Sequence, residues 1–167
     1  FFYDPAGWKK KNRRQYGERY GLLNWVSPIT SHEAEKQRQC LLSQLNDRVR
    51  YGFKDTKIDC RYLSKGCTLC GQGLWSCLFI NGLCNCACFY CPNTQDDISV
   101  PTTNRLTFND PVQYARYIRH FGFQGVSISG GEPFLTFERS LRYITAVKQH
   151  AGPHIYTWLY TNGTLVT

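Results

Sequence analysis

Cysteine constrains this chain more than any other residue, because its distribution is so uneven. Eight of the nine cysteines fall within residues 60–91, and none follows. A small secreted domain can use such a cluster for disulfides. Here the total is odd, no secretion signal precedes the cluster, and a helix-and-strand pattern follows it. We therefore interpret the cluster as metal-binding. The nine are Cys40, Cys60, Cys67, Cys70, Cys77, Cys84, Cys86, Cys88 and Cys91.

Downstream of the cysteines, strands and helices are expected to alternate. Short apolar runs predict strands at 75–80, 125–129 and 154–160, and amphipathic spacing predicts helices at 110–122 and 137–151. This order predicts an α/β fold with a parallel sheet and right-handed crossovers. Ligands of such sheets bind at the carboxyl ends of the strands, so the loops that follow the three strands form the candidate site.

The part before the first strand divides into two segments. Residues 1–55 are a basic lead-in with one helix, which a capping box at Thr30 opens and which runs to about Arg50. We expect Cys40 of this helix to lie in a core. Residues 56–74 are expected to form an irregular loop organised by metal, and residues 75–167 make the third segment.

The net charge of +8 is concentrated near the N-terminus. Two interpretations remain open for this basic arm. It is either a solvated segment, or a surface for nucleic acid in which aromatic side chains stack on bases. The residues concerned are Lys9, Lys10, Lys11, Arg13, Arg14 and Arg19, with the aromatic Trp8, Tyr16 and Tyr20 between them.

Cys84, Cys88 and Cys91 have the spacing of a cluster site. Three thiolates on one tight loop suit three irons of a [4Fe–4S] cube and leave the fourth iron without a protein ligand. Zinc would instead prefer four ligands in a closed structural site. Cys86 lies between these ligands and competes with them.

Residues 84–92 read Cys-Asn-Cys-Ala-Cys-Phe-Tyr-Cys-Pro, which resembles the Cys-Asn-x-x-Cys-x-Tyr-Cys motif of the radical S-adenosylmethionine (SAM) superfamily. A second motif that resembles this family follows the second predicted strand. It consists of Gly130, Gly131, Glu132 and Pro133.

The resemblance implies that this second loop contacts the methionyl amino group of SAM. The two glycines would permit close backbone approach, Glu132 would accept a hydrogen bond from the ammonium, and Pro133 would fix the turn. Tyr90 would lie against the adenine. Thr161 and Asn162 would face the SAM pocket, although Asn162-Gly163 is equally a plain turn signal.

The resemblance also implies a fold and a reaction. Residues 75–167 would be the first three units of a partial (β/α)6 TIM-like barrel, so we expect the chain to be a piece of a longer protein. The enzyme would reductively cleave SAM at a [4Fe–4S] cluster, with an electron donor such as flavodoxin or ferredoxin. Its substrate is unknown. Activation of a glycyl-radical enzyme or modification of a protein or peptide is favoured, and RNA-base modification is a further candidate.

Four upstream thiols predict a second metal site. Cys67-Thr-Leu-Cys70-Gly71 has the form of a metal-binding knuckle, and with Cys60 and Cys77 it could hold zinc or an auxiliary Fe–S cluster. The alternative is that Cys77 is a core residue and the others are free thiols. A cysteine-bearing segment ahead of the first strand also resembles activase-like radical SAM proteins.

The competing functional class is a non-catalytic zinc or Fe–S module with a basic nucleic-acid-binding arm. No apolar run approaches the roughly 20 residues that a membrane-spanning helix needs, so we expect no membrane partner. With no signal peptide in sight, we expect a cytoplasmic protein.

Overall fold

The computed structural model describes residues 10, 13–45, 47–88, 90–91, 93 and 95–166. The chain divides into two units, Phe1–Arg48 and Val49–Thr167. Several residues discussed above lie outside the described ranges: Trp8, Lys9 and Lys11 of the basic arm, and Phe89 and Pro92 of the cysteine motif.

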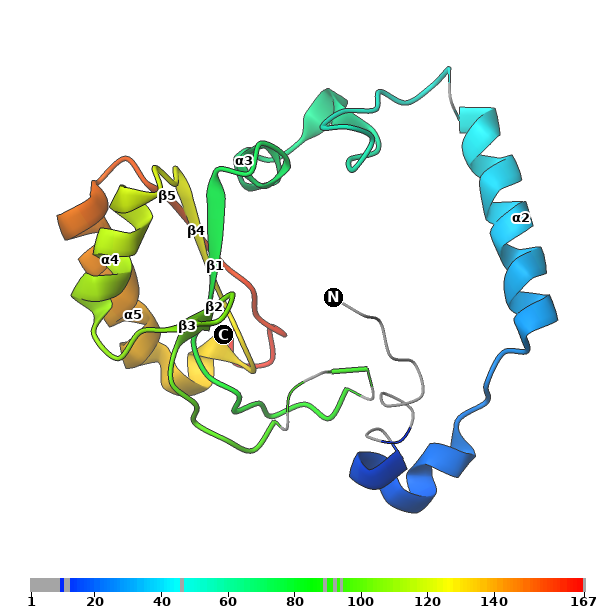
Figure 1. Ribbon diagram of the computed structural model, residues 1–167, viewed down its shortest axis with the longest axis horizontal. Helices are drawn as coiled ribbons and strands as arrows, with labels where there is room; N and C mark the ends of the chain where they lie inside the picture. The colour runs from blue at the N-terminus through cyan, green and yellow to red at the C-terminus, as the bar shows by residue number, and fades with distance from the viewer. Residues whose placement is uncertain are drawn as a thin grey trace. The chain divides into compact units, whose positions relative to one another are not determined.

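The N-terminal unit contains the 3-10 helix η1 (Gly17–Leu22) and the helix α2 (Pro28–Leu45) (Figure 1). The hydroxyl of Ser27 accepts the backbone N–H of Thr30 at 3.1 Å. Ser27 therefore caps the helix, with Pro28 in the first turn, three residues before the predicted cap. The helix ends at Leu45, before the predicted end near Arg50.

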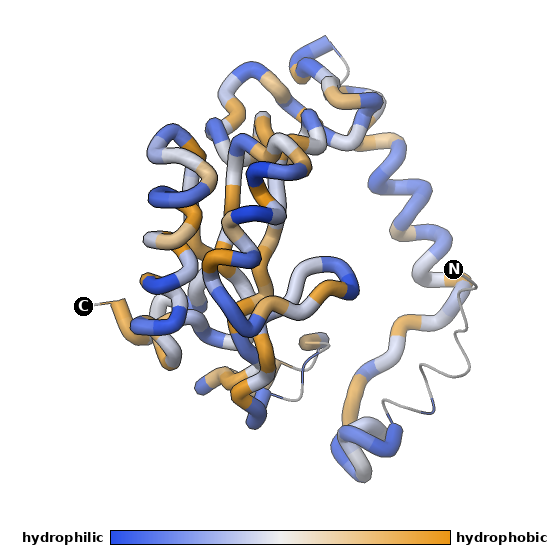
Figure 2. Tube along the Cα trace, turned by 60° about the vertical axis from the view of Figure 1, so that its left-hand side comes forward, coloured by the Kyte–Doolittle hydropathy of each residue, from blue (hydrophilic) through white to orange (hydrophobic). Residues whose placement is uncertain are grey.

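No described residue of this unit is buried. Cys40, which we expected in a core, is exposed. The reason is that α2 is hydrophilic over most of its length (Figure 2). A helix needs a continuous apolar stripe to bury one side, and α2 lacks it.

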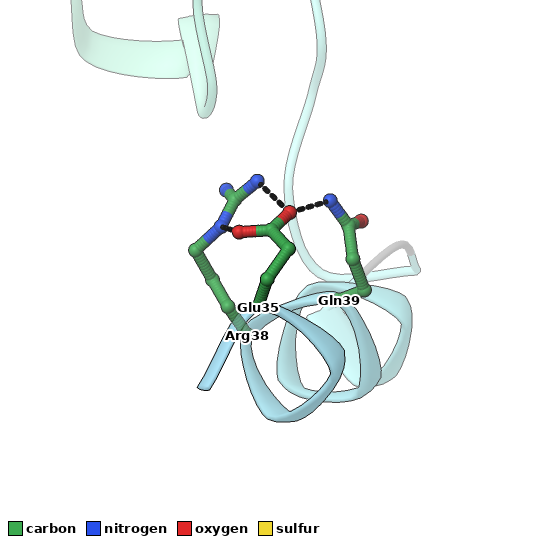
Figure 3. Close-up of polar contacts among 3 residues, drawn as sticks. All are labelled: Glu35, Arg38 and Gln39. Atoms are coloured by element: carbon green, nitrogen blue, oxygen red, sulfur yellow. Dashed lines mark hydrogen bonds and ion pairs between the residues drawn. The ribbon is translucent and has the colours of Figure 1, made fainter. Parts of the chain in front are cut away.

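The polar surface of α2 is organised around one carboxylate (Figure 3). The guanidinium of Arg38 donates to both oxygens of Glu35 at 2.7 and 2.8 Å, and Gln39 Nε2 donates to Oε1 at 2.7 Å. These hydrogen bonds, Arg38 first, lower the pKa of Glu35 to about 2. Exposed pairs of this kind add little to stability, so they mark a solvent-facing helix.

The second unit is built on a five-stranded mixed sheet in the order β3-β2-β1-β4-β5. Strands β1 (Trp75–Phe79), β4 (Gly125–Ser129) and β5 (Tyr156–Leu159) are parallel. They confirm the three predicted strands. An antiparallel hairpin of β2 (Thr102–Thr103) and β3 (Leu106–Thr107) extends the sheet beside β1. The sheet is open.

Helix α4 (Pro111–His120) joins β1 to β4 through the hairpin, and α5 (Phe137–Ala146) joins β4 to β5 and continues as the π-helix η4 (Val147–Ala151). Both helices lie on the same face of the sheet (Figure 1). Their bounds confirm the predicted helices. Asp110 caps α4 by accepting the N–H of Val112 at 2.9 Å.

The hydrophobic core fills the space between these helices and the sheet. Its sheet side includes Leu78, Val126 and Ile128, and its helix side includes Tyr114, Ile118, Tyr143 and Val147. The opposite face of the sheet is only half-buried. There Trp75 and Trp158 stack with ring centroids 6.1 Å apart.

Part of that second face is covered by α3 (Lys65–Gly71), which we had expected to be irregular. The prediction of an irregular loop is wrong for these residues. The hydroxyl of Ser64 accepts the N–H of Cys67 at 3.1 Å and so caps the helix. Leu69 is buried, and Gly66 lies close to the ring of Trp158. The cap and this packing outweigh the low helix propensity of the glycines.

Upstream of α3 lies the 3-10 helix η2 (Cys60–Tyr62), and the 3-10 helix η3 (Pro133–Thr136) precedes α5.

Within the described ranges, no helix is long and apolar enough to cross a membrane.

Candidate functional site

Three loops leave the sheet at one edge. Phe79 at the end of β1 pairs with Ser129 at the end of β4, and Ile128 pairs with Leu159 at the end of β5. The segments that follow these strands begin at Ile80, Gly130 and Tyr160. They carry the cysteine motif, the glycine-rich motif and the Thr161-Asn162 pair, as the sequence predicts for a parallel sheet.

The cysteine loop is folded back on itself by Gln95. The backbone N–H of Cys84 donates to the carbonyl of Gln95 at 3.0 Å, and the side-chain amide of Gln95 donates to the carbonyl of Cys88 at 3.4 Å. Gln95 has a φ of +71°, which a long side chain rarely adopts. Nothing in the sequence indicated this residue, because its role depends on backbone geometry.

The thiols of this loop are free and partly buried. The N–H of Cys86 donates to the sulfur of Cys84 at 3.4 Å. Partial loss of hydration, with the neighbouring Cys84 and Cys88 thiols, raises the pKa of Cys86. A hydrogen bond with Cys88 raises the pKa of Tyr90, whose side chain is 75% exposed. These three thiols therefore lie within electrostatic reach of one another.

The cysteine loop offers the donor type that an iron–sulfur cluster uses, because soft thiolates are the ligands of such clusters. Within the described ranges, no three Cys, His, Asp or Glu side chains are gathered closely enough to hold one metal ion.

The glycine motif packs directly on the start of the cysteine loop. The N–H of Gly131 donates to the carbonyl of Asn81, and the N–H of Glu132 donates to that of Leu83, both at 2.7 Å. A Cβ on Gly131 would overlap the carbonyl of Leu83. Gly130 has a φ of +137°, and a Cβ there would lie 2.5 Å from the carbonyl of Asn81. Both glycines thus permit a close approach to the protein's own backbone.

The carboxylate of Glu132 is fully buried and surrounded by protein donors. Oε1 accepts the N–H of Phe134 at 3.0 Å and the hydroxyl of Thr161 at 2.8 Å. Oε2 accepts the N–H of Asn162 at 2.8 Å, with the same hydroxyl at 3.0 Å. The expected contact between Glu132 and the SAM ammonium stays a prediction, but the carboxylate already joins two of the three loops.

Asn162 reaches the third loop. Its side-chain amide donates to Oδ1 of Asn85 at 2.8 Å and lies 3.2 Å from the sulfur of Cys86 and 3.9 Å from that of Cys84. The Asn85 amide in turn donates to Thr164 at 2.8 Å. Asn162 therefore contacts the cysteine loop, and its Oδ1 also accepts the backbone N–H of Thr164 at 3.0 Å, as a turn residue would.

The four upstream thiols are brought together only in part. Cys60 donates to the carbonyl of Lys57 at 3.5 Å, and the ammonium of Lys57 lies 3.8 Å from the sulfur of Cys70. Cys67 and Cys70 line one pocket of about 240 Å³ together with Lys57. Cys77 does not line this pocket. Burial raises the pKa of its thiol, and the hydroxyls of Ser127 and Ser129 oppose that shift.

Two comparisons with known proteins identify the family. Residues 69–167, more than half of the chain, match the family described as the 4Fe-4S single cluster domain. A protein of Methanocaldococcus jannaschii is 32% identical over 105 residues, which cover 57% of this chain and 27% of that protein. Its name, which is provisional, is glycyl-radical enzyme activating enzyme. No solved structure matches.

The chain thus spans about a quarter of the length of this relative. The matched region includes the cysteine motif, the glycine motif and all three parallel strands. It supports a 4Fe–4S cluster as the cofactor. The chain belongs to the family of 4Fe-4S single cluster domains.

Proposed function

We propose that this chain is part of a radical SAM enzyme that activates a glycyl-radical enzyme. The observation that carries the proposal is the meeting of the three strand-end loops, which Glu132 and Asn162 join by hydrogen bonds. A site for a cluster and for SAM needs both motifs at one edge of the sheet. The relative's name supports a glycyl-radical enzyme as the substrate.

In this proposal Cys84, Cys88 and Cys91 hold the cluster. The chemistry that such a cluster supplies when bound is one-electron reduction of SAM, whose sulfonium bond then breaks to give methionine and a 5′-deoxyadenosyl radical. The protein binds SAM, orients it and excludes water. An external donor such as flavodoxin or ferredoxin would provide the electron.

The amino end of SAM would bind at the glycine motif. The carbonyls of Gly130 and Gly131 accept no hydrogen bond from any residue in the described ranges, so they are available to an ammonium. Tyr90 is exposed beside the cysteine loop and would lie against the adenine. The polar end of β5, with Thr161 and Asn162, would line the same pocket.

The sheet would be the first half of a partial (β/α)6 barrel. In that arrangement α4 and α5 form part of the outer layer, and the half-buried face with Trp75, Cys77 and Trp158 turns toward the barrel interior.

The direct test uses the full-length protein with its cluster reconstituted under anaerobic conditions. We expect reduced protein to convert SAM to 5′-deoxyadenosine and methionine. We also expect it to produce a glycyl-radical signal in electron paramagnetic resonance when the cognate glycyl-radical enzyme is added. A cluster-loaded, reduced protein that leaves SAM intact would contradict the proposed reaction.

A second candidate function concerns the N-terminal unit alone, which we propose binds single-stranded nucleic acid. It contains a pocket of about 850 Å³ lined by Arg13, Arg14, Tyr20 and Trp25 among others. The rings of Tyr20 and Trp25 have centroids 5.0 Å apart, and the Arg13 guanidinium lies 5.7 Å from the Tyr20 ring. Aromatic rings beside guanidinium groups suit stacked bases and phosphates.

The test is salt-dependent binding of a single-stranded RNA oligonucleotide to the full chain. Arg13→Ala with Arg14→Ala should weaken binding and reduce its salt dependence. The control Lys36→Ala changes a charge on α2 that does not line the pocket. Equal binding by the double variant and the control would contradict this function.

A further inference from the structure

Glu132 has a place in the fold that the proposed contact with SAM does not explain. Its side chain is fully buried, whereas a carboxylate that serves only an incoming ligand would be open to the pocket. It receives four hydrogen-bond contacts from Phe134, Thr161 and Asn162. Two of these donors belong to the segment that follows β5, about thirty residues away in the sequence.

Such a carboxylate is held in place by its partners. An ionised carboxylate offers about four acceptor positions, and here protein donors use most of them. Removing one donor would leave a buried charge partly unsatisfied, which is costly. The hydrogen bonds therefore hold the three donor residues in place as well as the carboxylate of Glu132.

The next link leads from Glu132 to the thiols. Glu132 fixes the backbone N–H of Asn162, and the side chain of Asn162 donates to Asn85 and lies 3.9 Å from the sulfur of Cys84, a proposed cluster ligand. The loop is tied back a second time, because Asn85 donates to Thr164 at 2.8 Å. A displacement at Glu132 would thus reach the Cys84–Cys86 turn through one intermediate residue.

We propose that Glu132 is a positioning residue for the cysteine loop, acting through Asn162. This inference rests on the proposed function, since it assigns Glu132 a role at the same site. Its consequence is that Glu132 matters to the cluster before SAM binds. Donors near cluster sulfurs raise the reduction potential, because they stabilise the more negative reduced state.

The experiment compares Glu132→Gln, Asn162→Ala and the double variant in the reconstituted full-length protein. Without SAM, each single variant should lower the midpoint potential of the cluster. The double variant should lower it no further than the stronger single one, because residues that act in series are not additive. SAM affinity should also fall in Glu132→Gln, because the loops that would bind SAM lose hydrogen bonds that hold them in place.

A matched control is Thr157→Val. It changes a threonine on β5 to a residue of the same shape, and Thr157 lies outside this hydrogen-bonded set. It should leave the potential and the SAM affinity at wild-type values. If Glu132→Gln weakens SAM binding but leaves the SAM-free potential unchanged, Glu132 is a direct ligand of SAM and the proposal is wrong.

A second measurement keeps the inference separate from the proposed function. In the metal-free full chain, hydrogen exchange of the Asn162 amide should be at least several-fold faster in Glu132→Gln and in Thr161→Val than in Thr157→Val. Unchanged exchange would overturn the positioning role even if the protein cleaves SAM. If exchange is faster in these variants but the wild-type protein binds no cluster on reconstitution, the positioning role stands and the proposed function is wrong.

Discussion

Gly131 lies against the carbonyl of Leu83 so closely that no side chain fits between them. The contact joins the loop after β4 to the loop after β1, and the N–H groups of Gly131 and Glu132 fasten it on either side. Because every atom that a Cβ would meet belongs to the backbone, the neighbours cannot rotate away. The cysteine loop would have to move instead.

We therefore expect Gly131→Ala to destabilise the protein and to lower its iron content after reconstitution. Overpacking of this kind costs about 1–3 kcal/mol, and Gly131→Val should cost more. The measurements are the free energy of unfolding and iron per chain. Gly21→Ala is the control, because a Cβ at Gly21 would meet nothing within 4 Å. Wild-type stability and iron content in Gly131→Ala would contradict this prediction.

The ligand assignment predicts different results for the three proposed ligands and for Cys86, which lies between them in the sequence. Changing Cys84, Cys88 and Cys91 together to Ala should remove one cluster's worth of iron and its visible absorption, because the cluster loses all of its protein ligands. Cys86→Ala should keep both. The residues changed in the two variants lie in the same loop, so Cys86→Ala also controls for general damage to that loop. A cluster that survives the triple change would mean that other thiols hold it.

The sequence was sufficient to predict the parts of the fold that have strong local patterns. The three parallel strands and the helices after Asp110 and Thr136 could be predicted from apolar runs and from the Asp110-Pro111 cap. The meeting of the two motifs at one edge followed from strand order alone. Figure 1 shows this arrangement, with α4 and α5 on one face of the sheet.

Other features depended on contacts between distant residues. The strands β2 and β3 have two residues each, too few for alternation to be visible. Helix α3 depends on its cap and on packing against Trp158. On α5, Leu141 is 44% exposed, whereas Tyr143 is buried. The hydrogen bonds of Glu132 come from a segment after β5, so no local pattern predicts them.

The upstream thiols carry a separate prediction. We expect metal analysis of the Cys84, Cys88 and Cys91 triple variant to find residual zinc or iron bound by Cys60, Cys67 and Cys70. The ammonium of Lys57 lies 3.8 Å from the sulfur of Cys70 and would have to move aside for a cation. A triple variant with no metal at all would show that this second site does not exist.

Cys77 can be tested within the same protein. Its thiol lies in β1 opposite Ser127, and burial raises its pKa, which disfavours the thiolate that a metal requires. We therefore expect Cys77→Ser to retain the residual metal and Cys67→Ser to lose it. Loss of metal in both variants would make Cys77 the fourth ligand.

The buried tyrosine of α4 predicts how stability depends on alkaline pH. Tyr114 is fully buried and donates a hydrogen bond to the hydroxyl of Ser76 at 3.0 Å. Burial is the main cause that raises the pKa of Tyr114 above its usual value. In the unfolded chain this tyrosine loses its proton near pH 10. Above that pH the unfolded state binds fewer protons than the folded state, so the free energy of unfolding must fall as the pH rises.

We expect the loss to begin near pH 10 and to approach about 1.4 kcal/mol per pH unit for this one group. Tyr114→Phe should remove this contribution to the decrease of the unfolding free energy with pH. At neutral pH it should cost about 1 kcal/mol, because Ser76 loses a hydrogen-bond partner. Denaturant unfolding between pH 7 and pH 11 measures both effects. Tyr62→Phe is the control, since Tyr62 is 90% exposed and should leave the curve unchanged. An alkaline slope that is the same in Tyr114→Phe and in the control would show that Tyr114 does not limit stability at high pH.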